Sequence, residues 1–385
     1  MPRPRTVPGN VYQRKTGRWV IWFWDRSGKR HRCAAKAADE ASARDELAAI
    51  LGRMAKGEDP VAAELTLDAW ARRWIESRRA AGKGEADNEA AHVTHHIAPE
   101  LGRVKLRELS TAQVLDFVRR LPAHAAARGG GPISATTAWH IAGTLKLCMR
   151  DAAKRGLIPS SPCVWDASDL PERGAPAVGE GFSEAEVERL ISDTRIPEDR
   201  RVLYALEFLT GMRTGEAAAR RWRDWDPSRA PLGALKVDTS WSTKRQLEKA
   251  TKTRVTRTIP VHPALAELLE RWRAEGWPRA HGRAPAPEDL VVPAPDGAPR
   301  ANTSSWRDFQ RDLAALGLAR QRHYESRSTF LSLAEGGGAD LATVRLLTHP
   351  SPKSAADLYR RQRILWPKLC ESVRTIRVGE GARAA

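Results

Sequence analysis

Residues 341 to 361 read LATVRLLTHPSPKSAADLYRR, and this stretch places His349 and Tyr359 on either side of a helix break. Asp340, which comes shortly after three flexible glycines, is a good N-cap because its carboxylate can accept from backbone N–H groups of the first helical turn. The prolines at 350 and 352 should end the helix that Asp340 begins. That helix is predicted from apolar residues at helical spacing, namely Leu341, Val344 and Leu347.

A second short helix should follow the prolines and hold Tyr359 in about its first turn, because Ser354 and Asp357 form a capping pair. Taken alone, a tyrosine followed by Arg360 and Arg361 is typical of a partly exposed helix residue that packs its ring on a neighbour. A catalytic interpretation therefore needs support from elsewhere in the chain.

The length and charge of the chain indicate several domains and a polyanionic partner. Its 385 residues exceed one ordinary core and predict two or three domains. The 64 Lys+Arg against 47 Asp+Glu, a formal net charge of +17, favour nucleic acid as the partner. An anionic membrane surface is the competing explanation, but the longest apolar run, residues 20 to 24, is far too short to span a membrane.

The cysteines and the N-terminus indicate a cellular compartment. From its first residues we expect no signal peptide, because they are rich in proline and arginine and lack an apolar run. The four cysteines lack metal-ligand or disulfide spacing, which fits a reducing environment; they are Cys33, Cys148, Cys163 and Cys370. We therefore expect a soluble, cytoplasmic protein.

Residues 1 to 58 predict a small domain of three strands and one helix. The strands are expected at 11–14, 18–24 and 29–33, and the helix at about 41–56. The central strand should bury Trp19, Ile21 and Phe23 under the helix and present Val20, Trp22 and Trp24 on the other face. The residues expected to contact DNA from this domain are Arg18, Trp22, Trp24 and Lys29. A small scaffold without a nucleic-acid role is the alternative.

The rest of the chain predicts two larger domains. Residues 62 to 165 show helical periodicity, and residues 180 to 385 show helices with a small sheet formed by 234–238 and 254–261. His92, His95 and His96 share a helix face, but no carboxylate or cysteine lies at matching spacing, so we predict no metal site. The predicted fold is mainly α with small β elements: a sheet-plus-helix domain, an all-helical domain and an α+β domain.

The segment LTGMRTGEA, residues 209 to 217, places Arg213 at a junction between two helices. Gly211 can end one helix and Thr214 can cap the next, which leaves the guanidinium free to project into a cleft. A guanidinium suits a phosphodiester because it offers paired planar donors and stays protonated. A surface arginine among 64 basic residues is the ordinary alternative.

Further motifs follow Arg213 in a consistent order. Lys252-Thr253 precedes RTIPV at 257–261, Arg327 lies in SRSTF at 326–330, and His349 and Tyr359 come last. Together these motifs resemble those of the tyrosine recombinases, the phage-integrase family. The 1–58 unit resembles the arm-type DNA-binding domain of many integrases, in which the sheet enters the major groove. The 62–165 unit resembles the core-binding domain, and 180–385 resembles the catalytic domain.

The resemblance implies a mechanism of transesterification at one DNA strand. Tyr359 would attack the scissile phosphorus and form a 3′-phosphotyrosyl intermediate with a free 5′-hydroxyl, without a cofactor or metal. Arg213, Arg327 and His349 would stabilise the transition state, and Lys252 would protonate the departing oxygen. Glu216 would orient Arg213, and Arg254 and Arg257 are expected to contact DNA.

Three departures from the family pattern affect the site. Thr348 stands where glycine is usual, and Tyr359 follows His349 by ten residues instead of about nine. The usual His-x-x-Arg would place a histidine at 324, where this chain has Tyr324 preceded by His323. Either Tyr324 hydrogen-bonds in place of that histidine, or His323 reaches the site from a neighbouring position.

The leading interpretation is a site-specific recombinase, the integrase of a prophage or other mobile element, which cuts and rejoins double-stranded DNA at attachment sites. Such an enzyme would work as a homotetramer on DNA, with an accessory DNA-bending or directionality protein as a further partner and no membrane partner. A type IB topoisomerase-like enzyme and a catalytically degenerate architectural DNA-binding protein are the alternatives.

Overall fold

The computed structural model describes residues 9–24, 30–55, 65–127, 131–174, 179–251, 255–348 and 362–379. The chain divides into two compact units, Met1–Pro176 and Ala177–Ala385. Three separate hydrophobic clusters form, two in the first unit and one in the second. Among the described helices, none has the length and apolar character that a membrane span requires.

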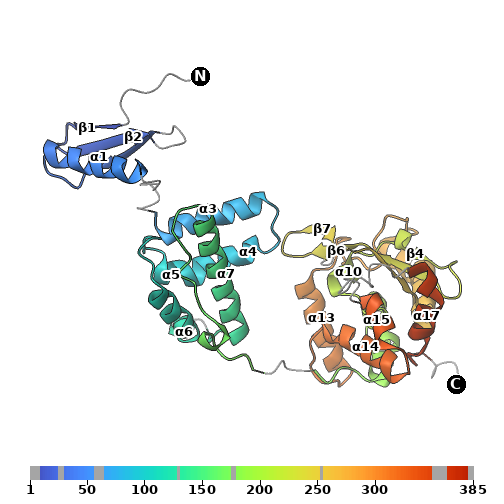
Figure 1. Cartoon of the computed structure of the whole chain (residues 1–385). Coiled ribbons are helices and arrows are strands. Elements are labelled where there is room, and N and C mark those ends of the chain that lie inside the picture. Colours follow the sequence, from blue (N-terminus) through green and yellow to red (C-terminus); the bar gives the residue numbers. More distant parts are fainter. Residues whose placement is uncertain are drawn as a thin grey trace. The chain divides into compact units, whose positions relative to one another are not determined.

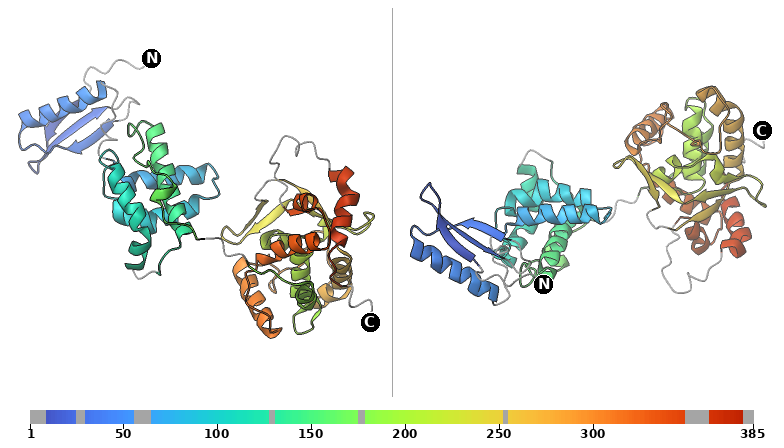
Figure 2. Two further views of the ribbon diagram at one scale, coloured as in Figure 1. Left: turned by 60° about the horizontal axis from the view of Figure 1, so that its bottom comes forward. Right: turned by 90° about the horizontal axis from the view of Figure 1, so that it is seen from above.

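The small N-terminal sheet has the strands and the buried face that the sequence predicts. Strands β1 (Gly9–Gln13), β2 (Trp19–Trp24) and β3 (Arg30–Ala34) pair antiparallel in the order β1-β2-β3. Helix α1 (Glu40–Ala55) lies across one face (Figure 2), where Ala43 and Leu47 pack with Ile21 and Phe23. Val20 lies on the opposite face but is nevertheless buried.

The helical part of the first unit is built around two helices joined by tryptophan hydrogen bonds. Trp70 Nε1 donates to the Cys148 carbonyl at 3.1 Å, and Trp74 Nε1 donates to Asp151 Oδ2 at 2.9 Å. These residues tie α3 to α7. The elements are α3 (Leu67–Ala80), α4 (Ala86–His92), the π-helical turn η1 (Val93–Ile97), α5 (Ala98–Leu101), α6 (Thr111–Ala127), α7 (Ala135–Lys154) and the short η2 (Ala167–Asp169).

Helix α9 (Glu198–Phe208) lies in the core of the second unit, and its residues from Val202 onward are all buried. The phenylalanines 182, 208 and 309 pack edge to face or tilted around it. The other helices are α8 (Glu184–Ser192), α10 (Thr214–Ala218), η3 (Trp222–Asp224), α11 (Pro263–Arg271), η4 (Trp272–Gly276), α12 (Trp277–His281), α13 (Asn302–Ala315), α14 (Glu325–Gly336), α15 (Leu341–Thr348) and α17 (Gln362–Arg374). Of these, α10, α13, α14, α15 and α17 are labelled in Figure 1.

The small sheet of the second unit confirms the predicted strand pair. Strand β5 (Ala234–Val237) pairs antiparallel with β8 (Arg257–Pro260) and with the short β4 (Trp225–Asp226). A separate hairpin, β6 (Thr239–Ser242) with β7 (Leu247–Ala250), was not predicted from the sequence. This hairpin packs β6 against α10, the helix that follows Arg213.

Candidate active site

The turn before α10 positions Arg213 and needs a glycine at 211. Gly211 has φ of 64°, in the left-handed region that favours glycine. An added Cβ there would lie 2.6 Å from Phe330 Cδ1 and 2.7 Å from Thr348 Cγ2, so α14 and α15 both approach this turn closely. The helix begins one residue earlier than expected, because Arg213 and not Thr214 is its N-cap residue.

Glu216 holds Arg213 by both its backbone and its side chain. Its Oε2 accepts from the Arg213 backbone N–H at 3.0 Å, and its Oε1 accepts from Arg213 NH1 at 3.0 Å. The Glu216 side chain is 1% exposed, whereas the Arg213 side chain is 26% exposed. The carboxylate therefore holds one terminal nitrogen of the Arg213 guanidinium, and part of the side chain stays accessible.

Arg327 reaches the same turn from α14. It donates from NH1 to the Gly211 carbonyl at 2.7 Å and from NH2 to the Thr348 carbonyl. Burial, and secondly the charge of Arg213, lower the pKa of Arg327 to about 10. It is thus still a cation at neutral pH, and because it is 2% exposed, its charge lies in the interior beside the turn that carries Arg213.

His323 and Tyr324 are the two candidates to replace the histidine that is usual three residues before Arg327, and they lie in different surroundings. His323 is buried, with its Nε2 2.7 Å from Glu207 Oε2 and its ring stacked on Phe309 at 4.7 Å. Tyr324 is 58% exposed, and its phenol group acts in a minor way to raise the pKa of Arg327. The structure therefore turns His323 into the interior, away from solvent, and leaves Tyr324 accessible.

Arg257 is not where a DNA contact would require it. The expected DNA-contacting arginine is 2% exposed, and its NH2 donates to Glu216 Oε2 at 2.6 Å while its NH1 donates to Oε1 at 3.4 Å. It lies on β8 opposite Val237 of β5, which directs its side chain into the unit. Both terminal nitrogens of Arg257 are engaged by the Glu216 carboxylate, so the structure does not present Arg257 as the surface contact to DNA that the sequence led us to expect.

Arg220 is a buried arginine to which sequence reasoning assigned no role. It is 0% exposed and donates from Nε to the Glu216 carbonyl at 2.9 Å and from NH2 to the Thr239 carbonyl at 2.9 Å. Its NH1 lies 3.2 Å from Asp224 Oδ2 and 3.6 Å from Asp238 Oδ1. It thereby ties α10 to the start of β6, and only its spacing of four residues from both Glu216 and Asp224 could have suggested this.

Several expected site residues lie outside the described residues: Lys29, Lys252, Arg254, His349 and Tyr359. The same holds for the helix predicted around Ser354 and Asp357. The described chain ends on one side at Thr348, which is 0% exposed and accepts from Arg327, and resumes with α17. Asp340 caps α15 as expected, since its carboxylate accepts from the Thr343 backbone N–H at 3.1 Å.

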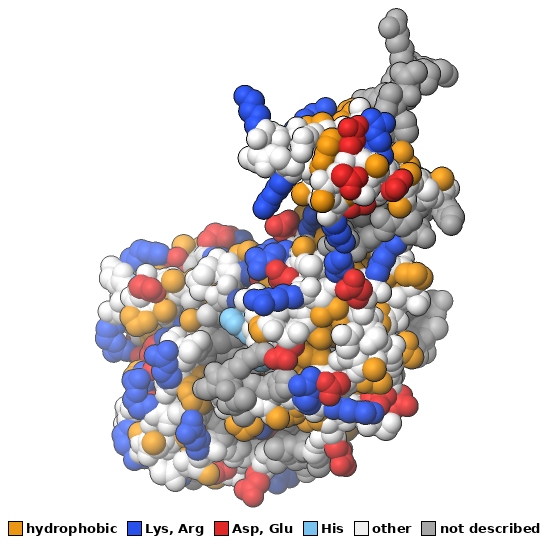
Figure 3. Space-filling view, turned by 90° about the vertical axis from the view of Figure 1, so that its left-hand side faces the viewer, with side chains coloured by type: hydrophobic (Ala, Val, Ile, Leu, Met, Phe, Trp, Pro, Cys, Tyr) orange, Lys and Arg blue, Asp and Glu red, His pale blue; other side chains and the backbone are white. Residues whose placement is uncertain are grey.

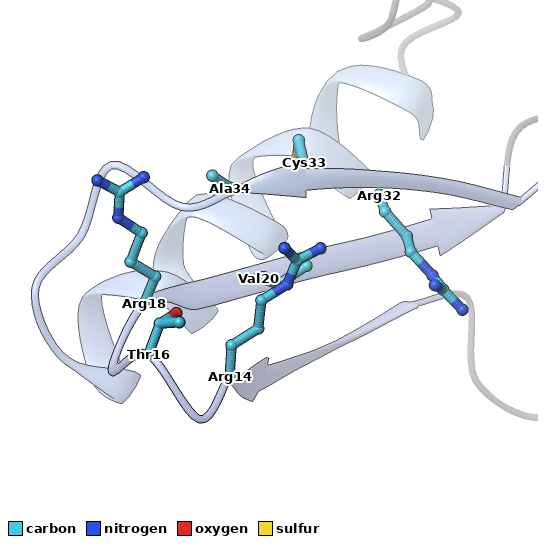
Figure 4. A pocket seen from close by; sticks show the side chains of 7 residues that line it. All are labelled: Arg14, Thr16, Arg18, Val20, Arg32, Cys33 and Ala34. Atoms are coloured by element: carbon cyan, nitrogen blue, oxygen red, sulfur yellow. The ribbon is translucent and has the colours of Figure 1, made fainter.

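The N-terminal sheet carries a basic and aromatic face opposite α1. Trp22 and Trp24 contact each other edge to face at 6.4 Å, and the Arg30 guanidinium lies 5.9 Å from the Trp24 ring. Beside them is a hollow of about 590 Å³ (Figure 4), lined by Arg14, Thr16, Arg18, Val20, Arg32, Cys33 and Ala34. Arginines together with half-buried aromatic rings suit a nucleic-acid surface.

Charges of both signs are spread over the surface. In Figure 3, blue Lys and Arg side chains are scattered across the visible face with red Asp and Glu among them. Many of the arginines are engaged in ion pairs, for example Arg195 with Asp193 and Arg283 with Asp289.

The histidines considered as metal ligands are not grouped, since the described residues contain no cluster of three or more potential ligands.

Comparison with solved structures shows the fold. The chain is similar to a lambda integrase dimer bound to a COC' core site (19% identity, TM-score 0.54), covering 94% of this chain and 97% of that one. A lambda integrase tetramer bound to a Holliday junction has 18% identity, the same TM-score of 0.54 and the same coverage, 94% and 97%. The Tn1549 transposon integrase (residues 82–397) in complex with circular intermediate DNA has 14% identity and a TM-score of 0.59, covering 83% and 98%.

Comparisons of the sequence itself add no closer relative. No family model and no curated protein matches this chain. At 14 to 19% identity the structural likeness concerns the backbone arrangement, which extends over most of each chain. The chain therefore has the fold of the lambda and Tn1549 integrases.

Proposed function

We propose that this protein is a site-specific DNA recombinase of the tyrosine type, which serves the integration and excision of a prophage or other mobile element. The observation that carries the proposal is the pair Arg213 and Arg327. The Arg327 guanidinium from α14 donates to the carbonyl of Gly211, two residues before Arg213, and the charge of Arg213 acts on it, in a chain with an integrase fold. Paired guanidiniums suit the two nonbridging oxygens of a phosphodiester.

In the proposed reaction the Tyr359 oxygen forms a bond to the scissile phosphorus, and the bond from phosphorus to the 5′-oxygen breaks. Lys252 gives a proton to that leaving oxygen. A free tyrosine has a pKa of about 10, so the adjacent cations must favour its phenolate during attack. Arg213, Arg327 and His349 stabilise charge on the nonbridging oxygens, and Tyr324 donates a hydrogen bond from its exposed position.

The proposed DNA partner is bound by more than the catalytic unit. Arg18, Trp22 and Trp24 lie on or beside the open face of the N-terminal sheet, and we extend this surface to Arg14 and Arg32, which line the same hollow. The three proposed domains are 1–58, 62–165 and 180–385, for arm-type DNA, core-site DNA and catalysis. The protein would act as a homotetramer on two duplexes, since one of its structural neighbours is a tetramer on a Holliday junction.

The test is to incubate the full chain with DNA spanning the ends of its own element and to detect a covalent adduct after denaturation. Tyr359→Phe should bind this DNA with near-native affinity and form no adduct, because only the attacking oxygen is removed. Tyr324→Phe is the matched control, because it too removes one phenolic hydroxyl, that of the exposed Tyr324. It should slow formation of the adduct without abolishing it.

The alternatives give different outcomes in the same experiment. DNA binding without any adduct would indicate an architectural relative. Relaxation of supercoiled plasmid without preference for the element ends would indicate a topoisomerase. An adduct that persists in Tyr359→Phe would move the nucleophile elsewhere and overturn the assignment.

A further inference from the structure

One carboxylate serves two arginines at the candidate site. Glu216 accepts from Arg213 NH1 and backbone N–H on one side, and from both terminal nitrogens of Arg257 on the other. The shorter side-chain bond is the one to Arg257, at 2.6 Å against 3.0 Å for Arg213. Glu216 is therefore committed at least as strongly to the buried arginine as to the accessible one.

The charges of this cluster do not balance. Counted over these four described residues, Arg213, Arg257 and Arg327 contribute three positive charges and Glu216 contributes one negative charge, a net charge of +2. Without Arg257, the pair Arg213 and Glu216 would be neutral and Arg327 alone would supply the excess. The pentacovalent state of a phosphodiester carries about two negative charges, so an excess of two cations complements it.

Arg257 differs from the other buried arginine in its partners. Arg220 lies near two carboxylates, Asp224 and Asp238, and donates to several carbonyls, so its charge is compensated locally. Among the described residues, the carboxylate that contacts Arg257 is that of Glu216. The Nε of Arg257 makes no hydrogen bond to the described residues. The charge of Arg257 is thus directed at the one carboxylate that would otherwise neutralise Arg213.

The direction in which the pKa of Glu216 is shifted agrees with this geometry. Burial acts to raise the pKa of Glu216, but hydrogen bonds and charge, first from Arg257 and then from Arg213, hold its pKa below the usual value. Arg257 is therefore the larger source of compensation for the carboxylate.

We propose that Arg257 is a positioning residue that offsets the charge of Glu216, so that Glu216 can orient Arg213 without cancelling its attraction for a phosphate. This inference rests on the proposed recombinase function. Arg257 touches neither DNA nor the reacting atoms and acts entirely through Glu216 and Arg213.

A probe that does not depend on the target DNA is inorganic phosphate, whose binding raises the melting temperature of the full chain. The part of that rise that is lost in Arg213→Met defines binding at this site. Arg257→Met should weaken this part about tenfold, the order expected for losing one nearby charge in a partly screened site. Arg257→Lys, which keeps the charge, should stay within about threefold of wild type.

The decisive comparison is the double variant Arg257→Met/Glu216→Gln. It removes one charge of each sign, keeps the excess at +2, and should recover phosphate binding to within about threefold of wild type. It also removes both partners of the buried pair, which proteins tolerate better than the loss of one. Arg220→Met is the matched control for a merely structural arginine, and Glu216→Gln should not rescue its effects.

The inference is overturned if Arg257→Met binds phosphate as tightly as wild type, or if Glu216→Gln fails to rescue it. Adduct formation on element-end DNA separates this from the proposed function. If wild type forms no adduct while the phosphate results hold, the recombinase function fails and the charge-offsetting role remains. If wild type forms the adduct and Arg257→Met does so at the same rate, only the role of Arg257 fails.

Discussion

Replacing Gly211 with alanine should destabilise the second unit far more than an ordinary glycine substitution. The residue has φ of 64°, and its added Cβ would contact Phe330 at 2.6 Å and Thr348 at 2.7 Å. The Gly211 carbonyl also accepts from Arg327, so the main chain has little freedom to move away. Both conformation and crowding therefore oppose the substitution.

The magnitude follows from these two contributions. A left-handed conformation costs an alanine about 1 to 2 kcal/mol. Overpacking in a well-packed interior adds about 1 to 3 kcal/mol. The free energy of unfolding should therefore fall by about 2 to 5 kcal/mol in Gly211→Ala.

Gly317→Ala is the matched control, because Gly317 has φ of 67° and nothing lies within 4 Å of its added Cβ. It should lose only the conformational part, about 1 to 2 kcal/mol. Urea titration with hydrogen exchange read in peptides from α9 and α14 would assign the loss to this unit. Equal losses in the two variants would show that α14 and α15 do not press on the turn, and would refute the packing that brings Arg327 to Arg213.

Three further predictions address chemistry and assembly. Lys252→Ala should cleave DNA about two to four orders of magnitude more slowly. A substrate with sulfur as the bridging leaving atom should recover most of that loss, because sulfur departs without a proton, whereas Arg213→Ala should not be rescued. Equal defects of Lys252→Ala on both substrates would remove Lys252 from the general-acid role. Deleting residues 1–58 should abolish binding to accessory arm-type sites while core-site cleavage survives, and loss of cleavage in a folded truncation would contradict that division. Because the folded-state pKa of Glu216 is lowered, its stabilising contribution is present above its unfolded pKa of about 4.3 and is lost as the pH falls through that value toward the folded-state pKa. Glu216→Gln should therefore lower the urea midpoint at pH 7 and much less at pH 3, and an equal decrease at both values would rule out this linkage.

Local sequence signals were reliable where the residues that interact are close in the chain. Ser183 and Glu186, a serine and a glutamate at capping-box spacing in the sequence, form such a box at the start of α8, with the Ser183 backbone N–H donating to Glu186 Oε2 at 2.9 Å. Asp340 caps its helix in the same way. The β6–β7 hairpin was missed because its second strand is exposed throughout and has no alternation of apolar and polar residues.

Long-range burial was the part that local patterns could not decide. Arg257 follows other basic residues and was assigned to DNA, yet the pairing of β5 with β8 directs it to Glu216. His323 and Tyr324 are neighbours in the chain, and spacing alone allows either of them to take the place of the usual histidine before Arg327. The aromatic packing of Phe309, more than ten residues earlier, draws His323 inward and leaves Tyr324 exposed.

The sequence by itself determined the mainly helical fold with small sheets, the junction at Arg213 and its partner Glu216, because helix caps and three-residue spacings act within one turn of chain. Only the tertiary structure decided that Arg327 joins Arg213 at the Gly211 turn and that Arg257 stands behind Glu216. These contacts span 116 and 41 residues. They depend on which faces of α14 and β8 are buried in the common core, and no local pattern carries that information.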